Sequence, residues 1–360
     1  MKLTYFLWGY PYDEAIIRAF QSQGFVVETV ELSSEFTECA CLGDIFFSVN
    51  FHSVISDFCQ KKGIPYCSWV LQLPNYDLYT QAVFHECNYI GICDSYLVEK
   101  MWNLGVKKAF FLPDAVELEK RIEGEYVERE FCFIAKQPEV VLQKQGMSLY
   151  GQGYLDSFLQ AQRVMYGNNF LETGLPKRVY QEVLNYNPIP DTILPQFQKL
   201  YVADYYLSPA CTVLQQNIFI KNNEKIMTIY SDNDFDMCKS KKYPYVSNEK
   251  ERWKIYQKKE FSLILVPHVF HNAIPREMLE VIAAGGFPIC SYQKDYSYFF
   301  EQDENLAFFT NTTEFQQAVV RYGNHPEERI RVKENAYRIV SEGHTYYHRI
   351  IHMLEMWDRL

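Results

Sequence analysis

Short apolar segments alternate with amphipathic ones along the first third of the chain. The apolar segments have the length of buried strands, and the amphipathic ones carry apolar residues at helical spacing. The predicted strands are residues 3–8, 25–30, 45–49, 65–70, 89–93 and 109–112, and the predicted helices are 13–22, 54–61 and 97–104. This alternation predicts βαβ units and a doubly wound parallel sheet, an α/β fold.

The rest of the chain repeats the pattern with a long helical interruption. Predicted strands are residues 131–135, 226–230, 261–266, 287–290 and 306–309. Predicted helices are a block over 140–186, two segments at 197–207 and 210–218, and a last helix over about 345–358. We therefore expect two Rossmann-like domains, residues 1–120 and 125–342, the second with a helical insertion at about 140–205, and a C-terminal helix in 343–360.

Length and composition limit the class of protein that this chain can be. A chain of 360 residues suits two domains of ordinary size. The net charge of −10 argues against a nucleic-acid partner, which needs a basic surface. No segment approaches the ~18 apolar residues of a membrane span, and residues 1–10 lack the features of a secretory signal. The ten cysteines form no CxxC pair, so we expect reduced thiols and a cytoplasmic protein.

The segment 261–291, FSLILVPHVFHNAIPREMLEVIAAGGFPICS, carries the candidate chemistry. It predicts a buried strand, a polar loop and a helix that begins near Pro275, so the loop lies where parallel sheets bind ligands. The first helical turn and Arg276 would hold a phosphate, and Glu280, one turn later, would accept hydrogen bonds from a ribose. The alternative is an ordinary Arg276–Glu280 surface ion pair.

Residues 274–349 resemble the C-terminal signature of the spore-maturation-type, or CgeB-like, bacterial glycosyltransferases. The matching pieces are IPREMLEVIAAGGFPICSYQKD, YFFEQDENLAFF and YGNHPEERIRVKENAYRIVSEGHTYYHRI. Upstream, NFHSVISDFCQKKGIPYCSWV, CDSYLVEKMWNLGVKKAFFLPDAV, FCFIAK and LYGQGYLDSFLQAQRVMYGNNFLE continue the resemblance in the same order. It thus covers most of the chain.

The resemblance implies a GT-B fold, with a ligand cleft between the two domains and a C-terminal helix that crosses back to the first. It also implies transfer of a sugar from a nucleoside-diphosphate sugar, a UDP-sugar above all, to a glycan, protein or small-molecule acceptor, with no metal or other cofactor required. The expected donor-binding residues are Lys136, Tyr230, Ser231, His271, Asn272, Ile274, Pro275, Arg276 and Glu280.

The loops after two first-domain strands are the candidate acceptor site. They contain Asn50, His52, Asn75 and Asp77, and His52 and Asp77 are the candidates for a catalytic base. The alternative is local: Asn50 and His52 cap the next helix, and Asp77 is a solvated turn residue.

Two positions depart from the expected pattern. Asn272 stands where many retaining GT-B enzymes have a glutamate, and Gln72 stands where the resembled family often has an aspartate. Because an amide cannot act as a base, a nucleotide-sugar-binding or scaffold subunit without activity stays an alternative. A sugar-nucleotide epimerase of the same architecture is a further one.

Two other motifs suggest metal chemistry. Residues 231–236, SDNDFD, resemble the acidic metal-binding motif of the GT-A fold, but a solvated loop is favoured because the calcium-loop glycine and glutamate positions differ. His344, His348 and His352 share a helix face, yet lack the glutamate of a metalloprotease motif, so a structural role is favoured and no metal site is expected.

Overall fold

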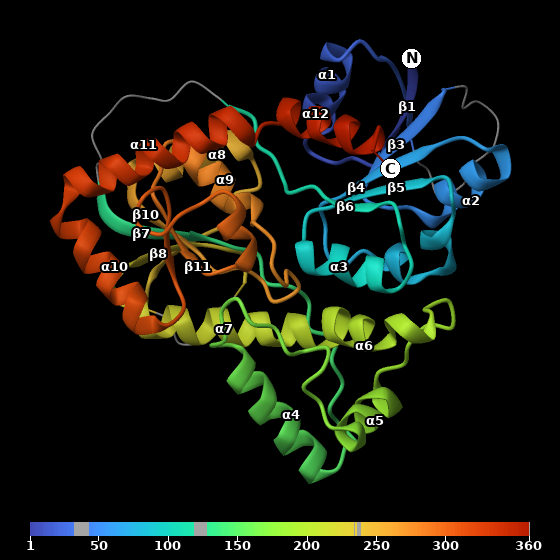
Figure 1. Ribbon diagram of the computed structural model, residues 1–360. Helices are drawn as coiled ribbons and strands as arrows, with labels where there is room; N and C mark the ends of the chain where they lie inside the picture. Colours follow the sequence, from blue (N-terminus) through green and yellow to red (C-terminus); the bar gives the residue numbers. More distant parts are fainter. Residues whose placement is uncertain (32–42, 119–127, 234, 236–238, 360) are drawn as a thin grey trace. The chain divides into compact units, whose positions relative to one another are not determined.

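The computed structural model describes residues 1–31, 43–118, 128–233, 235 and 239–359. The chain forms two compact units, which we describe separately (Figure 1). The first unit contains Met1–Glu117, Pro190–Gln198 and Glu342–Leu360, and the second contains Leu118–Ile189 and Lys199–Ser341. None of the helices in the described ranges is both long and apolar enough to span a membrane.

The first unit is built on a six-stranded parallel sheet. Its strands are β1 (Lys2–Leu7), β2 (Val26–Glu31), β3 (Ile45–Val49), β4 (Tyr66–Val70), β5 (Asn88–Ile92) and β6 (Ala109–Phe111), in the order β2-β1-β3-β4-β5-β6. All residues of β3 and β4 are buried, as the continuous apolar runs predict for central parallel strands. The strand order reverses between β1 and β3, which places the topological switch point of this sheet there.

The helices of the first unit include one from the far end of the chain. They are α1 (Asp13–Ser22), α2 (Ser53–Lys62), α3 (Ser95–Asn103), the 3₁₀ turns η1 (Tyr76–Tyr79) and η2 (Gln81–Phe84), and α12 (Tyr346–Trp357). α12 lies beside α1 (Figure 1), where Tyr346 stacks on Tyr12 with 5.9 Å between ring centroids. Trp357 stacks on Tyr89 of β5 at 4.4 Å. The C-terminal helix therefore completes the core of the first unit.

The second unit contains another six-stranded parallel sheet. Its strands are β7 (Glu128–Ile134), β8 (Met227–Tyr230), β9 (Lys241–Tyr243), β10 (Lys259–Ile264), β11 (Pro288–Ser291) and β12 (Ala307–Phe309), in the order β12-β11-β10-β7-β8-β9. The helices α8 (Glu249–Lys258), α9 (Arg276–Ala283), α10 (Thr312–Asn324) and α11 (Pro326–Gly343) follow the strands. This is the Rossmann strand order, and its switch point lies between β7 and β10.

A helical insertion separates β7 from β8. It comprises α4 (Leu149–Gln162), α5 (Lys177–Tyr186), α6 (Gln198–Tyr201), the π-helical segment η4 (Val202–Leu207) and α7 (Ser208–Asn223). Figure 1 shows α4 and α5 on the side of α7 away from the sheet. Residues such as Leu155, Val183 and Leu207 give the insertion a hydrophobic core of its own.

Two predictions about these elements are wrong, and some elements were not predicted. Residues 140–148 and 163–176 are not helical, because Gly146, Gly167 and Pro176 interrupt the block. The expected break near Pro209 is absent from the described helix, since Pro209 falls in the first turn of α7 directly after the wider π-helical segment. β9, α8, α10 and α11 were not predicted, because their sequences are mostly polar.

Arg349 fixes α12 to the end of the first sheet. Its guanidinium is buried and donates to the backbone oxygens of Pro113 at 2.9 Å and Gly343 at 2.8 Å. Burial lowers its pKa to about 10, and Asp114 opposes that shift. The arginine stays charged at neutral pH and satisfies carbonyl groups that water does not reach.

We predict that Arg349→Ala lowers the free energy of unfolding by about 3 kcal/mol, because several buried acceptors lose a charged donor. Urea unfolding followed by tryptophan fluorescence measures it. The exposed Arg359 near the end of α12 provides the control, and Arg359→Ala should change stability by less than about 0.5 kcal/mol. Equal effects of the two variants would contradict the role of Arg349.

Candidate functional site

The loop that joins β10 to α9 lies at the carboxyl edge of the second sheet. β10 ends at Ile264, Pro275 is the N-cap residue of α9, and Ile274 and Pro275 are buried. The positive end of the α9 dipole thus lies beside the switch point between β7 and β10. This arrangement suits an anionic ligand.

Glu280 is the most constrained charge in this region. Its side chain is 2% exposed, and its two oxygens accept from Arg252 Nε at 3.0 Å and Arg252 Nη2 at 2.9 Å. Arg276 Nε donates to the same carboxylate at 2.9 Å. Burial alone would raise the pKa of Glu280, but Arg276 and Arg252 outweigh burial and hold the pKa below its usual value.

The Arg276–Glu280 pair expected as the alternative is therefore present, but it is buried and has further partners. Arg276 also lies 3.8 Å from the Glu249 carboxylate of α8, and its side chain is 13% exposed. The guanidinium of Arg276 is therefore largely buried as well. Glu280 would meet a ribose only through an oxygen that already accepts from an arginine.

The ends of β7 and β8 hold three of the expected donor residues. Lys136 is exposed in the turn that follows β7. Tyr230 stacks on Tyr243 of β9 with 5.1 Å between ring centroids. Ser231 is 9% exposed, and its N–H donates to the carbonyl of Tyr243. Of the acidic motif 231–236, Asp234 and Asp236 lie outside the described residues.

The helical insertion holds the polar loop in place. His271 Nε2 lies 3.0 Å from the Asp204 carboxylate in the π-helical segment, and both side chains are buried. The His268 N–H donates to Thr212 Oγ1 at 2.9 Å, and its carbonyl accepts from Asn169 Nδ2 at 2.7 Å. The carbonyl of Asn272 accepts from the Asp295 N–H. Four residues outside the loop thus fix its path.

At the carboxyl edge of the first sheet, the expected acceptor residue Asn50 is hydrogen-bonded to Gln72. Asn50 has a φ of 61°, and its Oδ1 accepts from the N–H groups of Leu71 and Gln72 at 3.1 and 3.0 Å. Asn50 Nδ2 donates to Gln72 Oε1 at 2.9 Å. Asn75 follows in the same loop, where its Oδ1 is buried. The ends of β3 and β4 are therefore tied together by amide groups.

His52 lies at the switch point of this sheet. Its Nε2 is 3.2 Å from the Val49 carbonyl, so the ring donates there and leaves Nδ1 with a lone pair. Burial lowers the pKa of His52, so the ring is neutral at pH 7. Trp8, at the end of β1, packs against it at 4.9 Å and is itself 54% exposed. A neutral imidazole in this tautomer can accept a proton.

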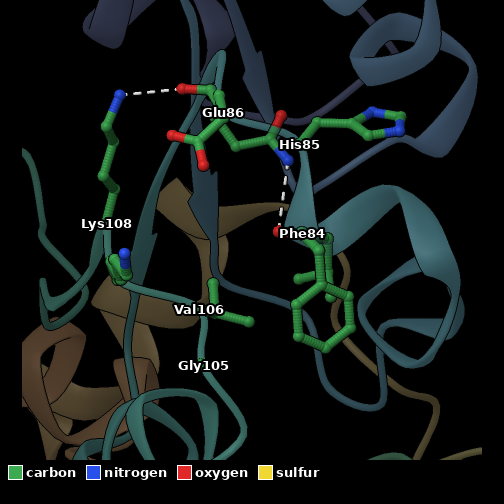
Figure 2. Close-up of a pocket in the computed structure, with 9 residues that line it drawn as sticks. Phe84, His85, Glu86, Gly105, Val106 and Lys108 are labelled. Carbon is green, nitrogen blue, oxygen red and sulfur yellow. Dashed lines mark hydrogen bonds between the residues drawn. The ribbon is translucent and has the colours of Figure 1, made fainter.

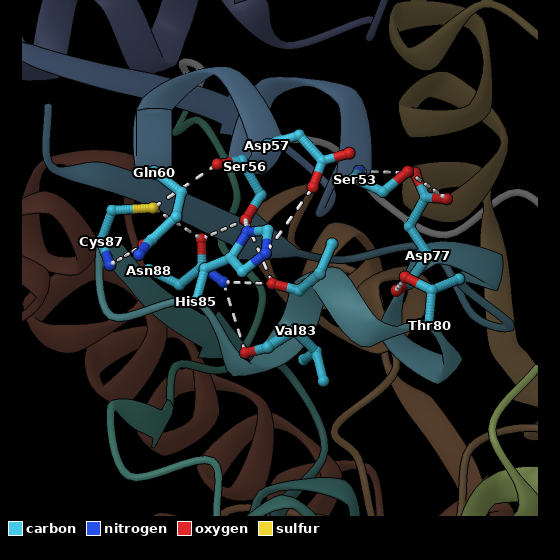
Figure 3. Close-up of polar contacts among 11 residues, drawn as sticks. Ser53, Ser56, Asp57, Gln60, Asp77, Thr80, Val83, His85, Cys87 and Asn88 are labelled. Carbon is cyan, nitrogen blue, oxygen red and sulfur yellow. Dashed lines mark hydrogen bonds and ion pairs between the residues drawn. The ribbon is translucent and has the colours of Figure 1, made fainter. Parts of the chain in front are cut away.

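The expected alternative for this loop is wrong about which side chain caps α2. Neither Asn50 nor His52 makes a capping hydrogen bond from its side chain, although His52 occupies the N-cap position. Asp77 instead accepts from Ser53 N at 2.9 Å and Ser53 Oγ at 3.0 Å (Figure 3). Asp77 therefore satisfies the first turn of α2 from a distant loop.

A Ser–His–Asp arrangement lies nearby but is not built for nucleophilic catalysis. Ser56 Oγ is 3.0 Å from His85 Nδ1, and His85 Nε2 is 3.7 Å from the Asp57 carboxylate (Figure 3). Ser56 is fully buried, and its hydroxyl also contacts the Ala82 carbonyl and Asn88 Oδ1. No substrate reaches such an oxygen, so the cluster fixes η2 against α2.

A cavity of about 170 Å³ opens at the opposite edge of the same sheet, before β5 and β6 (Figure 2). Phe84, Gly105 and Val106 line it, and Lys108 Nζ donates to the Glu86 carbonyl across its rim. This edge carries the amino ends of the strands, which are not where parallel sheets bind ligands.

The C-terminal histidines make other contacts. His344 is buried against Arg349, and His348 Nδ1 lies 2.7 Å from Thr345 Oγ1. No group of three or more His, Cys, Asp or Glu side chains in the described ranges is arranged to hold a metal ion.

Sequence reasoning missed three residues of these regions: Trp8, Asp204 and Arg252. The sequence does indicate the helix that carries Arg252, because Asn248 followed by Glu251 is typical of a helix N-terminus. In the structure, Asn248 Oδ1 accepts from Glu251 N at 3.2 Å. The sequence around Asp204 and Trp8 gives no such indication, since nothing in the local pattern identifies their long-range partners.

Two parallel Rossmann-like sheets define the chain as an α/β protein of the GT-B class. Anabaena HepE, solved with UDP and with UDP-glucose, superposes with a TM-score of 0.54 at 9% identity, over all of both chains. T4 phage BGT, solved with its UDP-glucose substrate, gives 0.51 at 9% identity, covering 100% of this chain and 98% of that one. The chain spans about half (54%) of TarM from S. aureus, which covers 87% of this chain at 7% identity and a TM-score of 0.46.

Residues 221–355 match the family model Glyco_trans_1_2, described as glycosyl transferase-like. The match runs from the end of α7 into α12 and covers less than half of the chain. A search of curated proteins finds no match. The narrower resemblance to the spore-maturation-type family stays a prediction.

We predict that Asp77→Ala lowers the free energy of unfolding by about 1–2 kcal/mol, because α2 loses its cap. Asp77→Asn keeps one acceptor oxygen and should lose less. Asp191, exposed in another segment of the first unit, is the matched control, and Asp191→Ala should leave stability unchanged. Wild-type stability in both Asp77 variants would contradict the capping role.

Proposed function

We propose that the protein transfers a glycosyl group from a nucleoside-diphosphate sugar, with a UDP-sugar the first candidate, to a hydroxyl of a glycan or protein acceptor. The observation that carries this proposal is the α9 N-terminus with Arg276 at the switch point of a Rossmann-ordered sheet. The family match over residues 221–355 and the UDP-sugar complexes of HepE and T4 phage BGT support it.

On the donor side, the diphosphate would lie at the first turn of α9, beside Arg276. Lys136, at the end of the neighbouring strand β7, would supply a second positive charge. Tyr230 and Ser231, at the end of β8, would flank the base, and His271 and Asn272 would border the sugar. These cations stabilise the charge that develops on the departing diphosphate, a task that needs no metal ion.

In the reaction, an acceptor hydroxyl oxygen forms a bond to C1 of the sugar while the bond from C1 to the diphosphate oxygen breaks. The nucleoside diphosphate leaves with that electron pair, and the hydroxyl proton passes to a base. We assign the base to His52, whose Nδ1 is available because Nε2 donates to the Val49 carbonyl. Asn50 and Asn75 would hydrogen-bond the acceptor, and Asp77 supports His52 by capping the helix that begins beside it.

The donor assignment is tested by incubating the purified protein with UDP-, GDP-, CDP- and dTDP-sugars and following binding and donor hydrolysis. Wild-type protein should bind one of them and keep its activity in EDTA. Arg276→Ala should weaken that binding by about 10- to 100-fold, the loss of a hydrogen bond to a charged group.

The exposed Arg338 on α11 gives the matched control, and Arg338→Ala should leave binding unchanged. Because Arg276 also pairs with Glu280, the fold of each variant is checked by thermal unfolding. No affinity of the wild type for any nucleotide sugar would refute the proposal.

For His52→Ala, we predict a 10²- to 10⁴-fold fall in turnover with donor affinity nearly unchanged, as for loss of a general base. The lowered pKa of His52 means that the wild-type rate stays level through pH 7 and falls only below pH ~6.5, where the ring gains a proton. His325, exposed after α10, is the control. Retention of the wild-type pH profile in His52→Ala would exclude His52 as the base.

A second candidate function is a nucleotide-sugar-binding subunit without transfer activity. It is favoured by Gln72 in place of a carboxylate and by Asp77, whose two oxygens are both bonded to Ser53. Tight nucleotide-sugar binding without donor hydrolysis or transfer to any acceptor would distinguish it.

A further inference from the structure

A small polar cavity lies inside the second unit, between the loop 165–169, helix α7 and the carboxyl ends of β10 and β11. Its volume is about 10 Å³, close to the minimum that holds one water-sized group. Met165 and Asn168, which also line it, are both exposed. We call it the amide pocket, after Gln215 and Gln293, which line it together with His268.

Three buried side chains that line the amide pocket have hydrogen-bonding atoms without a partner among the described residues. Gln215, Gln293 and His268 are 2%, 6% and 7% exposed. Gln215 Oε1, Gln293 Oε1 and His268 Nε2 have no hydrogen-bond partner among the described residues. Since buried polar atoms are almost always satisfied, three such atoms around one cavity indicate a ligand that supplies the missing hydrogen bonds.

The charges of the lining side chains limit the kind of ligand that the pocket could bind. Burial, with a smaller contribution from His271, lowers the pKa of His268 to about 4, so its ring is neutral at pH 7. The two amides carry no charge either. These three side chains therefore carry no charge that would neutralise a phosphate, a carboxylate or an ammonium group, and the other histidine of the lining, His271, is already paired with Asp204. A hydroxyl, which both donates and accepts, suits such a lining better.

The amide pocket is continuous with the loop assigned above to the donor. His268 belongs to that loop, and its backbone is fixed by Thr212 and Asn169 on the insertion. His271, which also lines the pocket, is held by Asp204. Arg276 begins α9 at the end of the same loop. A group that enters this pocket therefore lies next to the loop assigned to the donor.

We propose that the amide pocket receives one hydroxyl group of the donor sugar, which makes Gln215 and Gln293 specificity-determining residues. This inference rests on the proposed function. In the free protein a water molecule fills the same hydrogen bonds, and the sugar hydroxyl replaces it. A donor that lacks this hydroxyl leaves the amide groups unpaired and binds more weakly.

The test compares UDP-glucose with UDP by calorimetry, or the nucleotide sugar selected by the panel above with its own nucleoside diphosphate. Gln215→Met and Gln293→Met keep the side-chain length and remove the polar atoms. Each should weaken nucleotide-sugar binding by roughly 5- to 150-fold and leave nucleoside-diphosphate binding unchanged. Gln181→Met, at an exposed position of α5, is the control and should change neither.

Deoxy analogues of the sugar identify the hydroxyl. One analogue should bind the wild type more weakly than the parent sugar, and that difference should disappear in the Gln215 and Gln293 variants, because the same contact is removed twice. Thermal unfolding verifies that each variant folds, and replacing unpaired amides by Met should not lower the midpoint.

Three results would overturn the proposal. Unchanged nucleotide-sugar affinity in both variants means that the pocket holds only water. Equal losses for the sugar nucleotide and the nucleoside diphosphate mean that the amides support the loop without touching sugar. Absence of wild-type binding to any nucleotide sugar refutes the proposed function itself, and the sugar pocket with it.

Discussion

The charge on Glu280, buried between two arginines, sets the geometry of the second unit around its candidate site. A carboxylate taken out of water is tolerated only when it is paired and hydrogen-bonded. Arg252 reaches it from α8 and Arg276 from α9, so the two helices are held in one register. That register fixes where α9 begins and hence where the positive end of its dipole points. The ion-pair network is thus both a packing device and the support of the proposed diphosphate site.

The loop between β10 and α9 is held from its other side by the helical insertion. Asp204, Thr212 and Asn169 come from segments 56 to 99 residues away in sequence, yet all three bond to His268 or His271. Asp204 lies in a π-helical segment, and such segments are frequent at functional sites. The insertion therefore supports this loop. It also supplies Gln215, one of the two amide side chains of the amide pocket.

Much of the fold can be predicted from the sequence, because parallel strands that are buried on both faces have continuous apolar sequences. Predicted strand 45–49 and helix 13–22 have the bounds of β3 and α1. Where few residues are buried the apolar pattern weakens, so the exposed strand β9 and the mostly polar helices α8, α10 and α11 were not predicted. The helical block failed at its glycines and proline, where backbone preference outweighs apolar spacing.

For the site, the sequence by itself determined that Arg276 and Glu280 stand on the first turns of a helix after a buried strand, since that depends on local periodicity. It did not determine what these side chains bond. Only the tertiary structure decided that Arg252 shares Glu280, because a pairing between two helices leaves no trace in either one's spacing. Likewise, only the fold assigned Asp77 to the cap of α2 and brought Gln215 beside Gln293. Burial creates these needs for partners, and chain folding, not sequence proximity, meets them.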